Sequence, residues 1–178
     1  SMTIEAGTAS EGGAQRRLRL GMVGGGEGAF IGAVHRIAAR LDDHFQLVAG
    51  ALSAEPQRAA RSGAALGLDP QRCYASFDEM ARAERQHSEP IDAVAIVTPN
   101  HLHVPVATAF LRQGFHIICD KPLASTLADA LALRELERAS SKLFCLTHNY
   151  TGYPLVRHAR AMVAAGALGT IRLVQVEY

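Results

Sequence analysis

The segment LRLGMVGGGEGAFIGAVH, residues 18–35, restricts the fold of this chain more than any other part of the sequence. Its apolar start predicts a buried parallel strand, and the apolar spacing after its glycines predicts a helix. A glycine turn between a strand and a helix is the setting of the dinucleotide fingerprint G-x-G-x-x-G, in which phosphates meet unpaired N–H groups of the helix N-terminus. A simple turn is the alternative, but the flanking strand and helix favour a nucleotide site.

The glycines of that fingerprint have separate tasks. One allows the tight turn, the second lets the backbone approach a pyrophosphate, and the third lets the helix pack closely on the strand. Gly24 and Gly26 match the first two positions, whereas Gly28, Ala29 and Gly32 all compete for the third. The sequence therefore predicts the loop but leaves its third position open.

The composition argues against several other classes of protein. The 178 residues are 48% hydrophobic and carry a formal net charge of +1, which is typical of a globular domain. There is no Lys/Arg-rich run to suggest nucleic-acid binding, and no apolar stretch reaches the roughly 18 residues of a membrane span. Three cysteines without a C-x-x-C pair, and no visible signal peptide, predict free thiols and a cytoplasmic location.

The rest of the chain alternates predicted strands with predicted helices. Strands are expected at 18–23, 45–52, 72–75, 93–97, 116–119 and 143–146, and helices at 31–41, 56–66, 76–85, 105–113, 126–140 and 154–165. This alternation predicts an α/β protein with a doubly wound parallel sheet, because parallel strands need right-handed crossovers. Residues 18–166 form the expected nucleotide-binding domain, and 1–17, which show no periodicity, are expected to be disordered.

Glycines and polar residues follow five of these strands at the point where each strand ends. They are Gly24–Gly28, Ser53, Thr98-Pro99-Asn100, Asp120-Lys121-Pro122 and Thr147-His148-Asn149-Tyr150. Ligands of such sheets bind outside the carboxyl ends of the strands. The convergence of five strand ends on one edge therefore predicts where a ligand binds. Asn149 is a candidate for the lining of that site, although turn chemistry explains it equally well.

Ser53 stands where an NAD-preferring site usually holds a carboxylate for the ribose 2′-hydroxyl. A serine does not repel a 2′-phosphate, and Arg58 is close enough in the sequence to approach one. The alternative is a structural role, with Ser53 as a helix N-cap and Glu55 as a first-turn carboxylate. The sequence leaves both NAD and NADP open, with a slight preference for NADP.

Lys121 is the leading candidate for proton transfer. A lysine that leaves a buried strand toward the site would be desolvated, which lowers its pKa. The alternative is a surface lysine paired with Asp120. His101 and His103 form an H-x-H pattern, but no further ligands accompany it, so no metal site is predicted. His35 is expected to be an ordinary helix histidine.

The block TPNHLHVPVATAFLRQGFHIICDKPLA resembles the central signature of the Gfo/Idh/MocA family, the glucose–fructose oxidoreductases, inositol dehydrogenases and their relatives. The stretches VGGGEGAFIGAVHR and THNYTGYPLVRHARAMVAAGALGTIRLV resemble that family too, so the resemblance covers about 18–178. It implies a Rossmann fold and an NAD(P)-dependent oxidoreductase that transfers a hydride to or from a sugar, cyclitol or related polyol.

The resemblance also implies roles for individual residues. The lysine of the family's EKP motif falls on Lys121, which would bind or deprotonate the reacting hydroxyl and precede a cis peptide bond to Pro122. The turn 98–100 would line the nicotinamide and its ribose, and His103 matches the family's histidine after that turn. Together with the residues above, the expected cofactor contacts are Gly24, Gly26, Gly28, Ala29, Phe30, Ile31, Ser53, Arg58, Thr98, Pro99, Asn100, His103, Asp120, Lys121 and Asn149.

Three departures from the family pattern matter. Asp120 replaces a glutamate, and Gly28-Ala29-Phe30 lengthen the phosphate loop. Family members also continue into a C-terminal α/β domain that supplies the substrate pocket, so 167–178 is expected to be the start of a domain that this chain lacks. The chain would then be the cofactor domain of a dehydrogenase, inactive alone, or a stand-alone NAD(P)-binding module without turnover. A final strand is expected at 171–178. A homo-oligomer is also expected, in which this strand pairs between copies of the chain.

Overall fold

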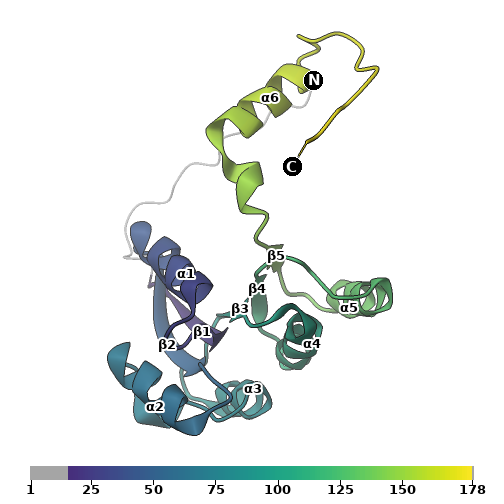
Figure 1. Ribbon diagram of the computed structural model, residues 1–178. Helices are drawn as coiled ribbons and strands as arrows, with labels where there is room; N and C mark the ends of the chain where they lie inside the picture. The colour runs from purple at the N-terminus through teal and green to yellow at the C-terminus, as the bar shows by residue number, and fades with distance from the viewer. Residues whose placement is uncertain (1–15, 178) are drawn as a thin grey trace.

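The computed structural model describes residues 16–177, and Figure 1 shows their arrangement. Five parallel strands form one sheet in the order β2-β1-β3-β4-β5. The strands are β1 (Leu18–Gly24), β2 (Phe45–Ala51), β3 (Ala93–Val97), β4 (His116–Cys119) and β5 (Phe144–Leu146). The helices are α1 (Phe30–Leu41), α2 (Pro56–Ala65), α3 (Phe77–Gln86), α4 (His103–Arg112), α5 (Leu127–Ala139) and α6 (Pro154–Ala164), with 3₁₀ turns η1 (Pro70–Arg72), η2 (Asn100–Leu102) and η3 (Asn149–Gly152). The predicted doubly wound α/β fold is confirmed.

Strand β3 lies in the middle of the sheet, and all five of its residues are buried. Val94 and Ile96 belong to a core shared with α3, α4 and α5, whereas Ala95 belongs to a second core shared with α1 and with Leu66, which follows α2. Figure 1 shows α3, α4 and α5 on one face of the sheet and α1 on the other. A strand buried on both faces reads as a continuous apolar run, which is why this element was predicted with the observed bounds.

The order of the strands reverses at β1. The chain passes from β1 to β2 on one side and later crosses back to β3 on the other side of β1. In open parallel sheets such a reversal leaves a crevice at the carboxyl ends of the strands, because the connections diverge there. The glycine turn that follows β1 therefore lies at the mouth of this crevice.

The predicted strand at 72–75 is wrong. Its place is taken by the 3₁₀ turn η1 and by a single parallel bridge between Gly50 and Cys73. The side chain of Asp69 accepts a hydrogen bond from the Gln71 N–H at 2.9 Å, and the ring of Pro70 favours the start of a turn. These local preferences leave the chain parallel to the edge of β2 for one residue only.

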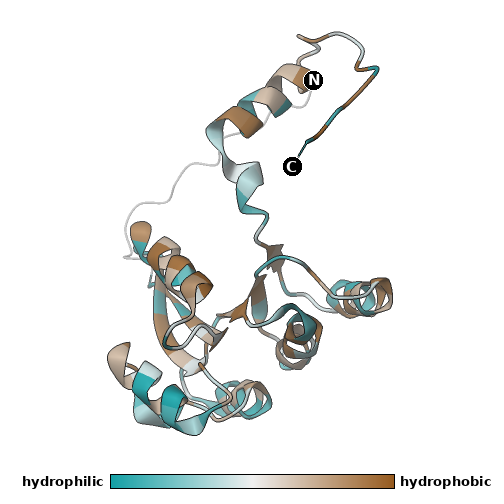
Figure 2. Ribbon diagram, in the orientation of Figure 1, coloured by the Kyte–Doolittle hydropathy of each residue, from teal (hydrophilic) through white to brown (hydrophobic). Residues whose placement is uncertain are grey.

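Two predicted apolar faces are not buried. Val34, Ile37 and Leu41 of α1 are exposed, although Ile31 and Ala39 of the same helix pack against the second core. Helix α6 contains no buried residue and extends away from the sheet (Figure 1). Figure 2 shows hydrophobic residues along both helices. Among residues 16–177, none of the helices is both long and apolar enough to span a membrane.

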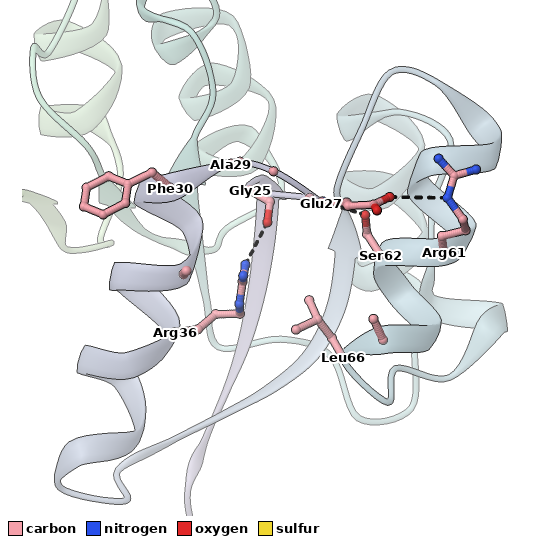
Figure 3. A pocket seen from close by; sticks show the side chains of 12 residues that line it. Gly25, Glu27, Ala29, Phe30, Arg36, Arg61, Ser62 and Leu66 are labelled. Atoms are coloured by element: carbon pink, nitrogen blue, oxygen red, sulfur yellow. Dashed lines mark hydrogen bonds and ion pairs between the residues drawn. The ribbon is translucent and has the colours of Figure 1, made fainter.

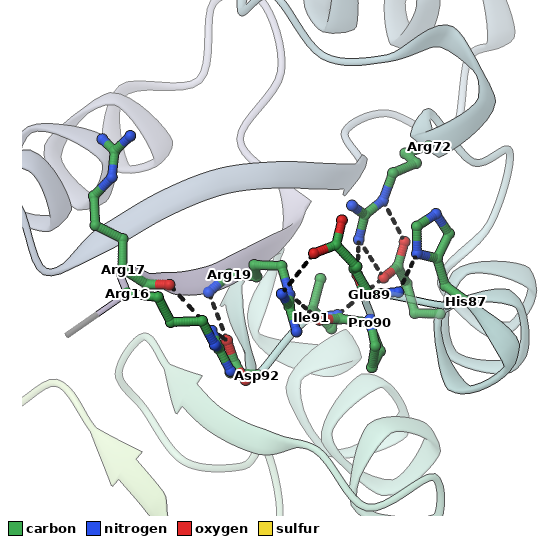
Figure 4. A network of polar contacts seen from close by, with 10 residues as sticks. Arg16, Arg17, Arg19, Arg72, His87, Glu89, Pro90, Ile91 and Asp92 are labelled. Atoms are coloured by element: carbon green, nitrogen blue, oxygen red, sulfur yellow. Dashed lines mark hydrogen bonds and ion pairs between the residues drawn. The ribbon is translucent and has the colours of Figure 1, made fainter. Parts of the chain in front are cut away.

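The two ends of the chain differ from the sequence-based expectation. The strand expected at 171–178 is absent from residues 171–177, which are exposed and have no regular secondary structure, while 178 lies outside the described residues. An apolar, β-branched run forms a strand only beside another strand, and among residues 16–177 no strand pairs with this one. Residues 1–15, most of the segment expected to be disordered, also lie outside the description. Arg16 contacts the domain, because its guanidinium donates two hydrogen bonds of 2.7 Å to Asp92 (Figure 4).

Candidate functional site

A cavity of about 600 Å³ lies at the carboxyl ends of β1, β2 and β3. It falls within the range of ordinary small-molecule sites, which is about 300–1,000 Å³. Residues from three strand ends that were predicted to bind the cofactor meet in its lining. These residues are Gly24, Gly26, Ala29, Ser53, Arg58, Thr98 and Pro99.

A second cavity of about 420 Å³ runs along α1 over the sheet. The residues of its floor, which include Leu20, Ala95 and Ile118, are apolar. The residues that follow β4 and β5 give the cavity a polar side. Four further residues of the prediction line it. They are Ile31, Asp120, Lys121 and Asn149. Because Ala29 lines the first cavity and Ile31 the second, the first turn of α1 adjoins both.

The four remaining candidates lie elsewhere. Gly28 and Phe30 line a third cavity of about 430 Å³ between α1 and α2, which Figure 3 shows from close by. Asn100 is exposed and opens the turn η2. His103 is 1% exposed and lies beneath the turn that it follows, so the structure assigns it a supporting position and not a place in a cavity lining.

The glycine turn shows why several of its positions need glycine. Gly24, Gly25 and Gly28 have φ angles of 80°, 74° and 80°, a region that other residues rarely adopt. A β-carbon on Gly32 would overlap Cα of Gly25, so Gly32 occupies the third position of the fingerprint, where helix packs on strand. A β-carbon on Gly26 would lie 2.6 Å from the Leu52 carbonyl oxygen, so this glycine is required by β2 as well as by any bound phosphate.

The first turn of α1 is open to an anion. Its N-cap residue is Ala29, which provides no side-chain hydrogen bond, and its first turn contains no acidic residue. The N–H groups of Phe30, Ile31 and Gly32 have no acceptor within the helix, since the first turn of any α-helix lacks them. These donors and the positive end of the helix dipole favour a phosphate between the two cavities.

At the end of β2, Ser53 has features of both predicted roles, a place beside the ligand and a structural role before α2. Its hydroxyl accepts a hydrogen bond from the Glu55 N–H at 3.1 Å, as in a capping role, while the residue also lines the first cavity. The helix N-cap is Glu55 and not Ser53. The carboxylate of Glu55 lies 3.7 Å from the Arg58 guanidinium, so the cation expected beside a 2′-phosphate is partly neutralised.

The end of β3 holds an unpaired polar atom. Among residues 16–177, Thr98 Oγ1 is the buried side-chain nitrogen or oxygen that lacks a hydrogen-bond partner. A buried hydroxyl without a partner loses its hydration without compensation. Nearby, the ring nitrogens of His103 lie 3.0 Å from the Thr98 carbonyl oxygen and 2.6 Å from the Pro122 carbonyl oxygen. His103 therefore connects the turn after β3 to the segment after β4.

The segment after β4 differs in part from what was expected. The Lys121–Pro122 peptide bond is cis, as predicted. The Lys121 side chain is exposed, so the burial on which its expected desolvation depends is absent. The alternative, a surface lysine paired with Asp120, holds only in part, because the lysine is exposed but the pair is not formed. Asp120 Oδ1 instead accepts a hydrogen bond from Thr147 Oγ1 at 2.9 Å and lies 3.5 Å from His35 Nε2.

Three residues that were not predicted to belong to the site contribute to this edge, among them His35, which was expected to be an ordinary helix histidine. His35 faces Asp120, Arg36 donates to the Gly25 carbonyl oxygen at 2.7 Å, and Ser62 accepts from the Glu27 N–H at 2.8 Å. The spacing of His35 and Arg36 on α1 is that of an ordinary helix, and Ser62 sits within an alanine-rich helix. Their contacts span 11 to 85 residues of sequence, so no local signal identifies them.

Comparison with known proteins gives a consistent result. Residues 18–148 match the family described as "Oxidoreductase family, NAD-binding Rossmann fold". The uncharacterized oxidoreductase YfiI of Bacillus subtilis (strain 168) is 37% identical over 162 residues, which is 90% of this chain and 41% of that protein.

Two solved structures have the same fold. An oxidoreductase from Sinorhizobium meliloti is 61% identical with a TM-score of 0.85, over 89% of this chain and 44% of that one. An inositol dehydrogenase homolog from Azotobacter vinelandii, complexed with NADH and myo-inositol, is 43% identical with a TM-score of 0.85, over 88% of this chain and 41% of that one. The chain thus spans less than half the length of these relatives.

Proposed function

Because the chain belongs to the oxidoreductase family with an NAD-binding Rossmann fold, we propose that it is the nucleotide-binding domain of an NAD(P)-dependent dehydrogenase acting on a sugar, cyclitol or related polyol. One observation carries this proposal. The second cavity brings Ile31, in the first turn of α1, together with Lys121 and Asn149. A phosphate-binding turn and a possible proton acceptor thus share one edge of the sheet.

The residues present fit a dinucleotide. The first turn of α1 has no side-chain cap, so its N–H groups are available to a pyrophosphate. The first cavity has the volume of a small-molecule site, and Thr98, whose buried hydroxyl lacks a hydrogen-bond partner, lies in its lining. Ser53 and Arg58 would face the adenosine ribose, with Thr98, Pro99 and Asn100 on the path toward Lys121.

Lys121 would act on the substrate. When bound, the nicotinamide supplies the acceptor of a hydride from a carbinol carbon, or its donor in the reverse direction. In the oxidation, Lys121 Nζ would hold the reacting hydroxyl and take up its proton. Asp120 accepts a hydrogen bond from Thr147 and lies 3.5 Å from His35 Nε2, so its role would be to hold the segment on which Lys121 lies.

The substrate class rests on the relatives. The Azotobacter vinelandii homolog is complexed with myo-inositol, a cyclitol, and the sequence blocks described above resemble enzymes of sugars and polyols. The side chains that line the second cavity beyond Lys121 offer an amide, a hydroxyl and an imidazole, from Asn149, Thr147 and His35. Such groups hydrogen-bond hydroxyls, which are the polar groups of a polyol.

The proposal is tested in two steps. Titration of the chain with NADH and with NADPH, followed by nicotinamide fluorescence, should show saturable binding of at least one. Turnover is then measured with a panel of sugars and cyclitols. This measurement uses a form of the protein that oxidises at least one member of the panel. There, Lys121→Met should abolish turnover while the cofactor still binds, whereas Lys142→Met should alter neither turnover nor binding. A chain that binds neither nucleotide, or a Lys121→Met variant with full activity, contradicts the proposal.

A further inference from the structure

Two consecutive peptide units of the glycine turn have all of their backbone groups hydrogen-bonded. In the unit between Gly25 and Gly26, the carbonyl oxygen accepts from Arg36 at 2.7 Å and the N–H donates to the Leu52 carbonyl oxygen at 3.1 Å. In the unit between Gly26 and Glu27, the carbonyl oxygen accepts from the Ala29 N–H at 3.0 Å. The N–H of this second unit donates to Ser62 Oγ at 2.8 Å. Side chains from α1 and α2 thus fix one end of each unit.

Such anchoring matters because these units are intrinsically mobile. The Gly25–Gly26 unit rotates with little steric resistance, since neither neighbour carries a β-carbon, and the Gly26–Glu27 unit has a β-carbon on one side only. Rotation of either unit would break its hydrogen bonds and change the path of the turn into α1. Because both N–H groups already donate to Leu52 and Ser62, the donors left for an anion are those of the first turn of α1, whose place depends on the glycine turn.

Arg36 lies on α1, one helical turn after Gly32, and its side chain extends back to the glycine turn. Figure 3 shows its guanidinium beneath the turn, pointing at the Gly25 carbonyl oxygen. Burial lowers the pKa of this guanidinium, and the nearby charge of Arg40 lowers it further. A partly desolvated cation that donates to a carbonyl oxygen forms a stronger hydrogen bond than a neutral donor does.

Ser62 anchors the turn from the opposite side. The residue is 4% exposed and lies under Gly26 and Glu27, where a β-carbon on Gly26 would come within 2.9 Å of its oxygen. On the next residue of α2, Gly63, a β-carbon would overlap the sulfur of Cys73, so α2 also packs closely against the segment after η1. The neighbouring Arg61 contacts only the Glu27 side chain in the described network, with an N–O distance of 3.3 Å and both partners more than half exposed.

We propose that Arg36 and Ser62 are positioning residues of the cofactor site, which anchor the Gly25–Gly26 and Gly26–Glu27 peptide units and thereby keep the first turn of α1, with its free N–H groups, in place for a pyrophosphate. This inference rests on the proposed function. According to this inference, part of the affinity for the cofactor depends on two residues outside the fingerprint, in addition to the fingerprint glycines. Their effect is on ligands that carry phosphates, because neither side chain bonds to another part of the site in the described structure.

The test compares Arg36→Met and Ser62→Ala with the unaltered chain. Arg36→Met keeps the length of the side chain and removes its donors, and Ser62→Ala removes one oxygen. Loss of a hydrogen bond to a charged group corresponds to about a ten-fold or larger change in an equilibrium constant, so Arg36→Met should weaken NADH and ADP binding by about that factor. Ser62→Ala should weaken both by a smaller factor. Adenosine, which has no phosphate, should bind all three proteins equally in NMR titrations.

Arg61→Met is the matched control, because this arginine lines the same cavity but bonds to a side chain. It should leave NADH affinity unchanged, whereas a general effect of positive charge would weaken binding in both arginine variants. The inference would be overturned if Arg36→Met and Ser62→Ala both bound NADH as tightly as the unaltered chain does. It would also be overturned if these variants lost adenosine binding in parallel with NADH binding. If Arg36→Met fails to fold by circular dichroism, Ser62→Ala decides the outcome. Failure of the unaltered chain to bind either nucleotide would instead overturn the proposed function.

Discussion

A β-carbon on Gly32 would overlap Cα of Gly25 and approach the Gly25 carbonyl oxygen to 2.9 Å. The first turn of α1 thus rests directly on the glycine turn. The position of the helix N-terminus, and with it the N–H groups offered to a phosphate, depends on this contact between two residues without side chains.

We predict that Gly32→Ala displaces α1 from the end of β1. Overpacking of a tight contact costs about 1–3 kcal/mol of stability, and the displaced turn should weaken NADH binding more than ten-fold. Urea denaturation and NADH titration measure the two effects. Gly152→Ala is the control, since a β-carbon at Gly152 meets no atom within 4 Å. An unchanged NADH affinity in Gly32→Ala would refute the assignment of Gly32 to the third fingerprint position.

We predict a large loss of stability in Arg72→Met. The carboxylate of Glu84 is fully buried and accepts from Arg72 at 2.6 and 3.0 Å, from the Tyr74 hydroxyl at 2.8 Å and from the Ile91 N–H at 3.0 Å. Figure 4 shows the Arg72 side of this network. Removal of one partner of a buried ion pair leaves an uncompensated charge and costs about 3–5 kcal/mol, which chemical denaturation measures.

Two further variants check that interpretation. Arg134→Met removes an exposed ion pair with Glu135 and should cost less than about 1 kcal/mol. In Arg72→Met with Glu84→Gln, the unpaired charge is gone, so part of the lost stability should return. A double variant as unstable as the sum of the two single variants would argue against a buried charge as the cause.

We predict that the contribution of Asp92 to stability depends on pH. Hydrogen bonds from Arg16 hold the pKa of this carboxyl below its usual value, and the Arg19 N–H adds to the effect. Because the folded-state pKa lies below the unfolded-state value, the carboxylate stabilises the fold above about pH 4 and loses this effect as the pH falls through the folded-state pKa.

The comparison of Asp92→Asn with the unaltered chain makes this measurable. At pH 7 the variant should be less stable by about 1 kcal/mol, because a charged hydrogen-bond acceptor is replaced by a neutral one. The difference should shrink as the pH is lowered below 4. A difference that stays constant from pH 7 to pH 3 would show that the charge of Asp92 is not responsible.

We predict that the cysteines differ in reactivity. Burial raises the pKa of the Cys119 thiol to about 12, and the residue is fully buried, whereas Cys145 is exposed. Only the thiolate reacts, so iodoacetamide at pH 8 should label Cys145 and leave Cys119 unmodified. Peptide mass spectrometry gives the extent at each site, and urea-unfolded protein provides the fully labelled reference. Equal labelling rates in the folded chain would contradict the buried position of β4.

Local signals in the sequence account for much of the fold. The run Ala93–Val97 predicted a strand, and a helix was predicted from residue 76, where the Ser76 hydroxyl accepts from the Glu79 N–H at 3.2 Å. The glycine turn and the cis Lys121–Pro122 bond were predicted because short motifs encode them. These features depend on neighbours within a few residues, which a single sequence displays directly.

Features that depend on distant neighbours could not be predicted in this way. The apolar spacing of α6 indicates a buried face, but burial depends on a partner surface that the spacing does not specify. Residues 72–75 were predicted as a strand, but of these four residues Cys73 alone pairs, in one bridge with Gly50, and the extent of such pairing is a tertiary property that the local sequence does not specify. Arg36 was overlooked because its acceptor is a backbone carbonyl group on another element.

The central claim is that a nicotinamide dinucleotide binds across the first turn of α1, with a cavity on each side. NMR titration of the ¹⁵N-labelled chain with NADH, and with NADPH in parallel, tests it most directly. One nucleotide should saturate the shifts of the Phe30 and Ile31 amides together with those of Thr98 and Lys121, from both cavities. Saturable binding that leaves the Phe30 and Ile31 amides unshifted, or no binding of either nucleotide, would contradict the account.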